Sequence, residues 1–254
     1  MLRLYRIRHE GHPRYAAERE GRWRLVDGDI FGRFREGAEI SSDDAEILAP
    51  VSPSKLVCVG LNYRDHAAEQ GKPLPPEPLL FIKPSTSVIG HGDAIRSPLW
   101  AGRVDHEAEL GVVIGKPAFN VRANKASEHI LGLTCVNDVT ARDLQNKDIQ
   151  YTRSKGFDTF APIGPSIALG AGPEPRTVET WVNGTRRQAS DTSQLIFGIE
   201  ALVEFITFVM TLEPGDIIST GTPSGVGELG HGDTVIVKVG GVGELTNSVA
   251  AEQA

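Results

Sequence analysis

Residues 104–115 read VDHEAELGVVIG and combine strand-forming residues with acids at every second position, Asp105, Glu107 and Glu109. In a single strand, alternate side chains lie on one face, so the three carboxylates would crowd together at a cost in free energy. The opposite face is mostly apolar and the run continues into VVIG, which favours a central, buried strand. Buried acids require an ion pair or a bound cation, and the stretch itself contains no lysine or arginine.

Two interpretations of these acids are open. In the first, they form a solvated strand face of ordinary polar residues. In the second, Glu107 and Glu109 point the same way from positions i and i+2 and bind a hard divalent cation, which prefers carboxylate oxygens. Asp138 is the best candidate for a third carboxylate, because it ends the apolar run LGLTCVND and so lies at the end of a predicted strand.

The composition of the chain is that of a globular protein with a surplus of acids. It has 254 residues, of which 40% are hydrophobic, and a net charge of −7. A negative charge argues against nucleic acid or an anionic membrane as a partner. No run approaches the roughly 18 apolar residues of a membrane span, and the N-terminus MLRLYRIRHEGH lacks the apolar core of a signal peptide. Two cysteines in apolar runs fit a reducing compartment, so we expect a cytoplasmic protein.

The pattern of apolar runs predicts an α+β, mainly β fold. Short strand-like runs recur along the chain, among them KLVCVG, LLFIK, SIALG and TVIVKVGG, and Asn183-Gly184 predicts a hairpin turn. IEALVEFITFVMTL, with apolar residues at helical spacing, is the longest candidate helix. Many short strands with few helices argue against a doubly wound sheet. We expect residues 1–50 to form a small N-terminal β-rich domain and residues 51–254 to form a larger domain.

His66 and Glu69 form a second constellation, in the helical stretch NYRDHAAEQG. Residues three apart share a helix face, where a carboxylate orients the imidazole and raises its basicity. This arrangement is typical of a general-base dyad. A surface ion pair of no catalytic consequence is the alternative.

Three further segments carry polar residues suited to an anionic ligand. Arg142 and Gln145 in TARDLQ are also three apart, and arginine suits capture of a carboxylate, although a solvated helix fits the spacing equally. Lys155 lies in the polar segment SKGFD. The turn STGTPSGVG could present backbone N–H groups and the Thr222 hydroxyl to an anion, or be a plain loop.

Six segments together resemble the fumarylacetoacetate hydrolase family. They lie between residues 55 and 227 in the family's order: VGLNYRDHAAE, LLFIKPSTSVIG, VDHEAELGVVIG, VNDVTARDLQ, SKGFDTFAPIGP and ISTGTPSGVG. The resemblance implies a mixed β-sandwich roll, one divalent ion, Mg²⁺ or Mn²⁺, and a homodimer. Residues 1–50 are similar to the small extra domain of some single-copy prokaryotic members.

The resemblance also assigns expected roles to individual residues. Asp105 matches no metal ligand. By position, the remaining candidates match metal ligands (Glu107, Glu109, Asp138), catalytic residues (His66, Glu69, Lys155) and substrate-binding residues (Arg142, Gln145, Thr222).

The activity implied by the resemblance is that of an enzyme acting on a small 2-oxo or 2-hydroxydienoate dicarboxylic acid, with a cation-stabilised enolate. Isomerisation of 2-hydroxyhepta-2,4-diene-1,7-dioate in the catabolism of aromatic compounds is the first expectation. C–C hydrolysis of an acylpyruvate such as fumarylpyruvate and decarboxylation of oxaloacetate are alternatives. Leu61 departs from an arginine that is frequent in several hydrolases of the family. A non-catalytic β-rich module that binds a cation or a sugar explains the acids, but neither the His66/Glu69 pair nor Lys155.

Overall fold

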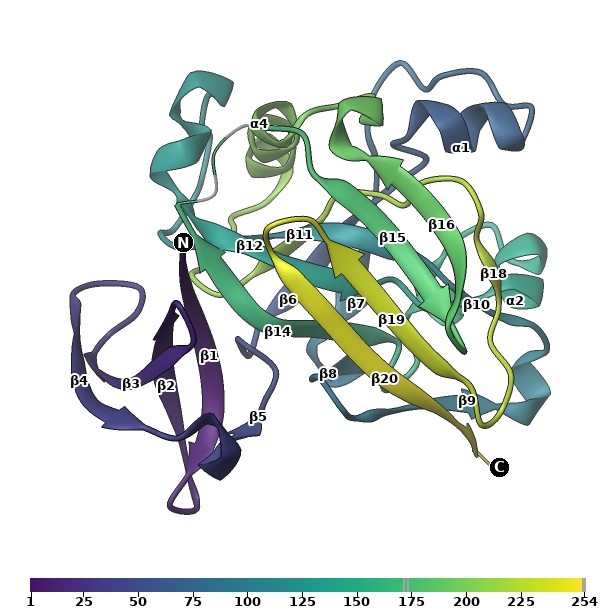
Figure 1. The fold of residues 1–254 in the computed structure, drawn as a ribbon. Coiled ribbons are helices and arrows are strands. Elements are labelled where there is room, and N and C mark those ends of the chain that lie inside the picture. The colour runs from purple at the N-terminus through teal and green to yellow at the C-terminus, as the bar shows by residue number, and fades with distance from the viewer. Residues whose placement is uncertain (171, 173, 253–254) are drawn as a thin grey trace.

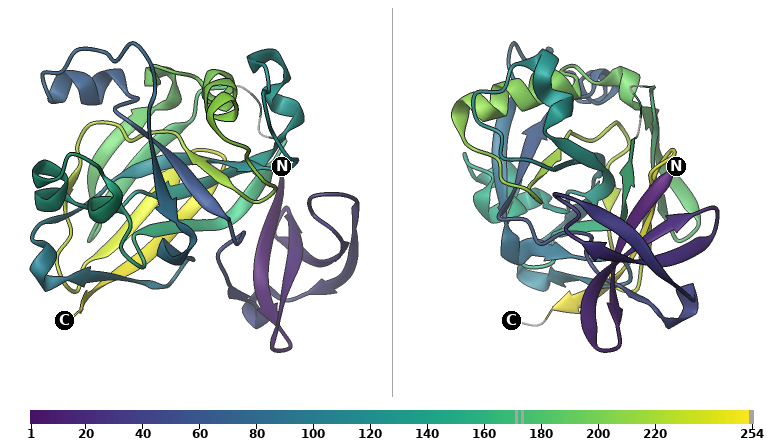
Figure 2. Two further views of the ribbon diagram at one scale, coloured as in Figure 1. Left: turned by 180° about the vertical axis from the view of Figure 1, so that it is seen from behind. Right: turned by 90° about the vertical axis from the view of Figure 1, so that its left-hand side faces the viewer.

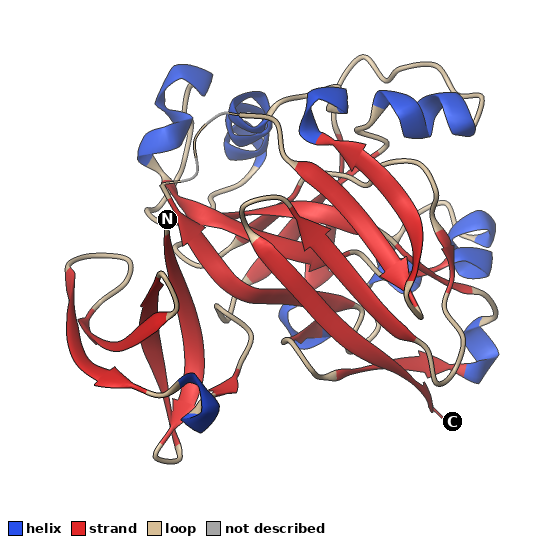
Figure 3. Cartoon of the chain, in the orientation of Figure 1, coloured by secondary structure: helices blue, strands red, loops and turns tan. Residues whose placement is uncertain are grey.

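The computed structural model describes residues 1–170, 172 and 174–252, and strands dominate it (Figures 1 and 3). Strands hold 47% of the chain and helices 18%, so the predicted α+β, mainly β class is confirmed. Among the described residues, no helix is both long enough and apolar enough to cross a membrane.

The largest sheet passes through the whole molecule. Its spatial order is β4 (Phe34–Ile40), β3 (Arg22–Gly28), β2 (His12–Arg19), β1 (Leu2–His9), β14 (Ala161–Leu169), β12 (Ile130–Asn137), β11 (Ala108–Ile114), β17 (Ile217–Ser219), β6 (Lys55–Gly60) and β7 (Leu79–Pro84). Two short strands lie beside it, β5 (Glu46–Ile47) on β1 and β8 (Val88–Ile89) on β14.

A second sheet covers the middle of the first (Figure 1). It has the order β16 (Thr185–Asp191), β15 (Thr177–Val182), β19 (Thr234–Val239), β20 (Gly243–Glu252) and β9 (Ala94–Pro98). A third, small sheet consists of β13 (Thr140–Ala141), β10 (Val104–His106) and β18 (Gly227–Glu228). The helices are α1 (Arg64–Glu69), α2 (Arg142–Lys147), α3 (Thr152–Lys155) and α4 (Ile199–Val209), with 3₁₀ turns η1 (Ser42–Asp44), η2 (Ser85–Ser87), η3 (Leu99–Ala101), η4 (Ala123–Glu128) and η5 (Thr192–Gln194).

Strand β11 lies at the centre of the core, as its apolar composition predicts. All of its residues are buried. Leu110, Val112 and Ile114 pack into the apolar layer that the second sheet and α4 share, while Val113 packs into the layer on the opposite face. Because β11 is covered on both faces and paired with β12 and β17 on both edges, Glu109, its second residue, is fixed in place.

The N-terminal strands β1 to β4 form an antiparallel meander that projects from one side of the body (Figure 2). β1 also pairs with β14 in the register Leu2 to Leu169 and Leu4 to Ile167, so the meander continues the main sheet. The division into domains at residues 1–50 and 51–254 stays a prediction.

Two local predictions are confirmed and one is wrong. Asn183 and Gly184 have φ of 49° and 76° and join β15 to β16, as an Asn-Gly hairpin turn requires. The long helical pattern forms α4. A single strand over 104–115 is wrong, because the stretch divides into β10 and β11 at Glu107. The Glu107 N–H donates to Asn137 Oδ1 at 3.0 Å, and the side chain of a neighbouring strand thus takes the place of a ladder partner.

Candidate active site

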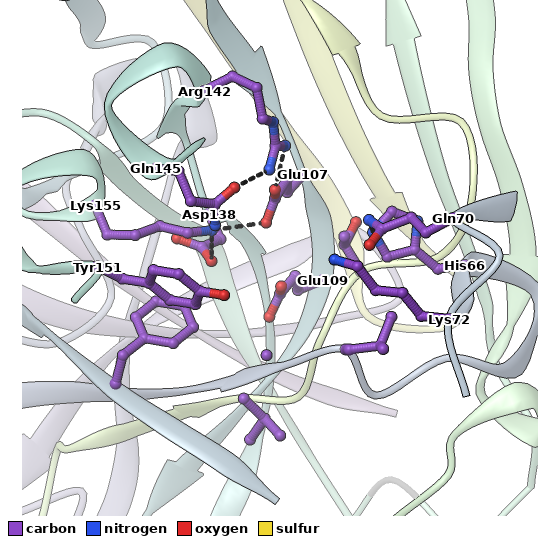
Figure 4. A pocket seen from close by; sticks show the side chains of 15 residues that line it. His66, Gln70, Lys72, Glu107, Glu109, Asp138, Arg142, Gln145, Tyr151 and Lys155 are labelled. Atoms are coloured by element: carbon purple, nitrogen blue, oxygen red, sulfur yellow. Dashed lines mark hydrogen bonds and ion pairs between the residues drawn. The ribbon is translucent and has the colours of Figure 1, made fainter. Parts of the chain in front are cut away.

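A pocket of about 80 Å³ lies at one end of the central strands of the main sheet, where β6, β12 and β17 end and β11 begins. The ends of these strands form its floor. Helix α1 with the following loop forms one wall, the α1 wall (residues 64–72). Figure 4 shows the side chains that line it. All of the predicted site residues line this pocket except Glu69, which contacts it through His66.

The three predicted metal ligands meet in the floor of the pocket. Glu107 is 5% exposed, and Glu109 and Asp138 are 1% exposed each. One carboxylate oxygen from each lies within 4.8 Å of the others. The strand break at Glu107 contributes to this arrangement, because the Asp138 N–H donates to the Glu107 carbonyl at 2.9 Å and brings the two chain segments together. Three hard oxygen donors at this spacing suit Mg²⁺ or Mn²⁺.

The surroundings of Glu109 show whether this cluster fits a cation. Its Oε2 accepts from the Ser219 hydroxyl at 2.6 Å and from the Gly221 N–H at 2.8 Å. Among the described residues it has no ion-pair partner within 4.0 Å. Burial and the negative charge of Asp138 raise the pKa of Glu109 to about 8. A buried carboxylate that is positioned by two donors but has no positive partner fits a site that takes a cation.

Lys155 lies between the other two acids. Its Nζ donates to Asp138 Oδ2 at 2.5 Å and to Glu107 Oε2 at 2.8 Å (Figure 4). Burial alone would lower the pKa of Lys155, but the two carboxylates outweigh it and raise the pKa above its usual range. The same contacts, with Arg142, hold the pKa of Glu107 well below its usual range in spite of its burial. Lys155 therefore remains an ammonium group inside the pocket at neutral pH.

Arg142, at the start of α2, explains how the first acid of the stretch is compensated. Its Nε donates to Asp105 at 2.9 Å and its Nη2 to Glu107 at 2.5 Å, while Nη1 donates to Gln145. Arg103 holds the other Asp105 oxygen at 2.6 Å. Asp105 thus takes part in ion pairs and stands apart from the cluster of three acids. Arg142 and Gln145 line the pocket, with the guanidinium already engaged by protein carboxylates.

His66 lies on the α1 wall, buried, with both ring nitrogens in contact. Nδ1 lies 2.9 Å from Glu69 Oε2, and Nε2 lies 2.7 Å from the Gln70 amide nitrogen. Glu69 uses its second oxygen to accept from the Gly225 N–H at 3.0 Å, which ties α1 to the Gly-rich turn after β17. The carboxylate orients the imidazole, as a general-base dyad requires.

The Gly-rich turn donates a hydrogen bond to a carboxylate of the protein itself. The Gly221 N–H donates to Glu109, as described above. The Thr222 hydroxyl donates to the Ala108 carbonyl at 2.9 Å and accepts from Gln188 at 2.8 Å. The turn therefore supports the acidic floor, and Thr222 presents the remainder of its side chain to the pocket.

Some residues of the site were not predicted from the sequence. Lys83 in β7 is fully buried and donates to Asp138 Oδ1 at 2.5 Å and to the Val139 carbonyl at 2.9 Å. Tyr151, Gln70 and Lys72 line the pocket. The motif LLFIKPSTSVIG contains Lys83, but a lysine at the end of a strand is typical of a solvent-exposed position, so the residue pattern alone did not single it out.

Gln188 of β16 binds the backbone and the hydroxyl groups that position the site. Its replacement is therefore predicted to lower the stability of the protein. Its Oε1 accepts from the Ala108 N–H at 3.0 Å and from Thr180 at 2.6 Å, and its Nε2 donates to Thr222 and to the Pro223 carbonyl. Gln188→Met removes this partner from the Ala108 N–H, the Thr180 hydroxyl and the Pro223 carbonyl, while Thr222 keeps its bond to Ala108. Because each such group costs about 1–3 kcal/mol, we expect the free energy of unfolding in urea to fall by about 3 kcal/mol. The exposed Gln150→Met is the control, and an equal effect of both variants would contradict this role.

The protein thus has a mainly β fold with one pocket that contains three buried carboxylates and a histidine from helix α1. This combination is typical of an enzyme that binds a divalent cation. The sequence matches the family described as fumarylacetoacetate (FAA) hydrolase, C-terminal, over residues 55–250, and the one described as Rv2993c-like, N-terminal, over residues 2–50. The chain belongs to the fumarylacetoacetate hydrolase family, whose members are enzymes.

Solved and curated relatives support this assignment. 2-hydroxyhepta-2,4-diene-1,7-dioate isomerase from Mycobacterium marinum is 41% identical with a TM-score of 0.92 and covers 99% of both chains. Fumarylpyruvate hydrolase from Pseudomonas aeruginosa, solved with Mn²⁺ and pyruvate, is 33% identical with a TM-score of 0.74 over 83% of this chain and 93% of its own. Oxaloacetate tautomerase YisK from Bacillus subtilis is 40% identical over 94% of this chain and 81% of its own. The predicted mixed β-sandwich roll of the family is confirmed.

Proposed function

We propose that this chain is a divalent-metal-dependent isomerase that moves a proton between the 2-oxo and 2-hydroxydienoate (enol) forms of a small dicarboxylic acid. One observation carries the proposal: a single pocket joins the acidic cluster, the Lys155 ammonium and the His66–Glu69 pair. Relatives named as an isomerase of 2-hydroxyhepta-2,4-diene-1,7-dioate and as an oxaloacetate tautomerase support it. Both names describe proton transfer without cleavage of the carbon chain.

Glu107, Glu109 and Asp138 are the residues that would hold Mg²⁺ or Mn²⁺ in this proposal. When bound, the cation supplies Lewis-acid stabilisation of the negative charge that develops on the 2-oxo oxygen. Lys155 contributes a second positive charge beside Glu107 and Asp138, whose carboxylates already fix its position. Such pre-positioned charge needs little reorganisation during the reaction. Arg142 and Gln145 border the position of the substrate, and Arg142 also keeps Glu107 in place.

His66 is the group that moves the proton in this proposal. Glu69 fixes Nδ1, which leaves Nε2 to take the proton from the carbon beside the 2-oxo group. Gln70, which now contacts Nε2, must turn aside when the substrate enters. The proton that His66 accepts returns to the other end of the conjugated system, so atoms and charge balance without a further reactant.

C–C hydrolysis is the second candidate. The same His66–Glu69 pair could activate a water molecule in place of the carbon acid. The relative named fumarylpyruvate hydrolase favours this reaction. Decarboxylation of oxaloacetate requires no activated water and would use the floor of the pocket alone.

One set of assays separates these reactions. The purified protein is given 2-hydroxyhepta-2,4-diene-1,7-dioate, acetylpyruvate or oxaloacetate, with Mg²⁺, with Mn²⁺ or with a chelator. We expect metal-dependent interconversion of the enol and keto forms, followed by ultraviolet absorbance, without release of pyruvate or CO₂. Release of pyruvate from acetylpyruvate would favour the hydrolase, and CO₂ from oxaloacetate the decarboxylase. Turnover of no substrate, with cation binding intact, would favour a β-rich cation- or sugar-binding module.

The α1 pair gives a prediction that separates catalysis from metal binding. His66→Gln should lower kcat by about 100-fold or more, because a positioned acid–base group contributes about 10²–10⁴. Glu69→Gln should have a smaller effect, since it acts by orienting His66 and its amide oxygen can still accept from Gly225. Calorimetry should show unchanged affinity for Mn²⁺ in both variants. A His66→Gln enzyme with the activity of the wild type would contradict the assignment.

A homodimer, a cytoplasmic location and a role in aromatic catabolism remain predictions. Light scattering of the purified chain tests the first of them. Nothing in the proposed reaction requires nucleic acid or a membrane.

A further inference from the structure

Lys72 is a cation of the pocket that the proposed mechanism does not use. It lies at the end of the α1 wall and lines the pocket. Figure 4 shows its side chain running from the wall toward the middle of the pocket, on the side of His66 and Gln70. Its position is therefore opposite the side from which Lys155 approaches the acidic floor.

The other positively charged side chains of the pocket already form ion pairs with carboxylates of the protein. Arg142 contacts Asp105 and Glu107, and Lys155 contacts Glu107 and Asp138. Among the described residues, none offers Lys72 a carboxylate within 4.0 Å. The exposed Lys72 can thus pair with a ligand without losing a partner, whereas Arg142 and Lys155 cannot without breaking an existing pair.

The backbone holds Lys72 in a defined position relative to His66. Gly71 has a φ of 62°, and its N–H donates to Ala68 O at 3.1 Å, while the Lys72 N–H donates to Ala67 O at 3.0 Å. This pair of bonds is the Schellman arrangement that ends a helix. Pro73 follows and restricts Lys72 to an extended backbone. The ammonium is therefore attached to the end of the helix that carries the proposed acid–base residue.

The segment of the pocket lining between the acidic floor and the α1 wall carries no charge. It consists of Val59 and Gly60 at the end of β6 and of Leu61, which follows the strand. A substrate whose 2-oxo acid end lies on the acidic floor would extend its other end past these residues toward the α1 wall. There Lys72, which has no carboxylate partner in the described part of the chain, matches one negative charge.

We propose that Lys72 binds the far carboxylate of the substrate and so selects 2-oxo dicarboxylic acids over 2-oxo acids with a neutral far end. The inference rests on the proposed function, because that function places the near end of the substrate on the floor. It makes Lys72 a specificity-determining residue, which contacts the substrate at a distance from the reacting carbon.

The test compares two substrates in four proteins. The substrates are oxaloacetate and its methyl ester at the far carboxylate, and the proteins are the wild type, Lys72→Gln, Lys72→Arg and the exposed Lys116→Gln, which lies outside the pocket. We expect Lys72→Gln to raise KM for oxaloacetate by about 10- to 100-fold, the value of a charge-assisted hydrogen bond. The ester should be unaffected, kcat should change less than about threefold, and Lys72→Arg should restore most of the loss.

A binding measurement keeps this inference separate from the proposed reaction. Calorimetry in the presence of Mn²⁺ compares oxalate, which has no far end, with difluorinated oxaloacetate, which has one but lacks the protons needed for enolisation. Lys72→Gln should weaken the second ligand about 10-fold or more and leave the first unchanged. Equal losses for both ligands, or for neither, would overturn the role of Lys72. Absence of turnover by the wild type would overturn the reaction alone, since the calorimetry would still decide what Lys72 binds.

Discussion

Lys155→Met is expected to lower kcat by about 100- to 1,000-fold, the usual loss when one preorganised donor to a developing negative charge is removed. The variant should also be less stable. The ammonium contacts Glu107 and Asp138 inside the pocket, and its removal leaves both carboxylates with less compensation. Breaking a buried ion pair costs about 3–5 kcal/mol. We expect the low end, because Arg142 and Lys83 still contact the two acids.

Urea denaturation with and without metal checks this result. In chelator, Lys155→Met should unfold at a lower urea concentration than the exposed Lys147→Met. Added Mg²⁺ should recover part of the difference, because a bound divalent cation brings positive charge to the same carboxylates. If metal stabilised Lys155→Met no more than the wild type, the proposed sharing of these acids between Lys155 and the cation would be wrong.

Glu109→Gln is expected to abolish measurable activity and to weaken Mg²⁺ and Mn²⁺ binding by at least about 100-fold. Even changes to the partners of metal ligands cost about 10- to 100-fold in affinity, and this change removes a proposed ligand charge. Glutamine keeps the shape, and its amide oxygen can still accept from Ser219 and Gly221. The fold should therefore survive the substitution.

The stability of Glu109→Gln distinguishes a metal ligand from a structural acid. A buried carboxylate without a positive partner is a cost to the metal-free protein, so the variant should unfold at an equal or higher urea concentration in chelator. Added metal should raise the stability of the wild type and of the surface control Glu200→Gln only. Unchanged metal affinity in Glu109→Gln, measured by calorimetry, would remove Glu109 from the set of ligands.

Local pattern and motif order predicted much of this fold. The Asn183-Gly184 turn and helix α4 follow from short-range rules of backbone conformation and apolar spacing. The convergence of the site residues in one pocket followed from the order of six motifs, since spacing alone left each motif with a plain structural alternative.

Features that depend on contacts between distant segments could not be predicted. The break at Glu107 depends on the Asn137 side chain, which reaches across from β12. Lys83 is buried because Asp138 and the Val139 carbonyl receive its ammonium group, whereas its own segment is typical of a strand end. Asp105 obtains its charge compensation from Arg103, one residue before the stretch, and from Arg142 on another element.

The pairing of β1 with β14 has a consequence for the tendency of the chain to aggregate. Without residues 1–50, β14 would present the backbone groups of Ile167, Ala168 and Leu169 along an open edge. Such an edge is a template for intermolecular strand addition and aggregation. The N-terminal meander therefore acts as a protective cover for the main sheet. Because the meander precedes β14 in the chain by more than a hundred residues, it is synthesised well before its partner strand.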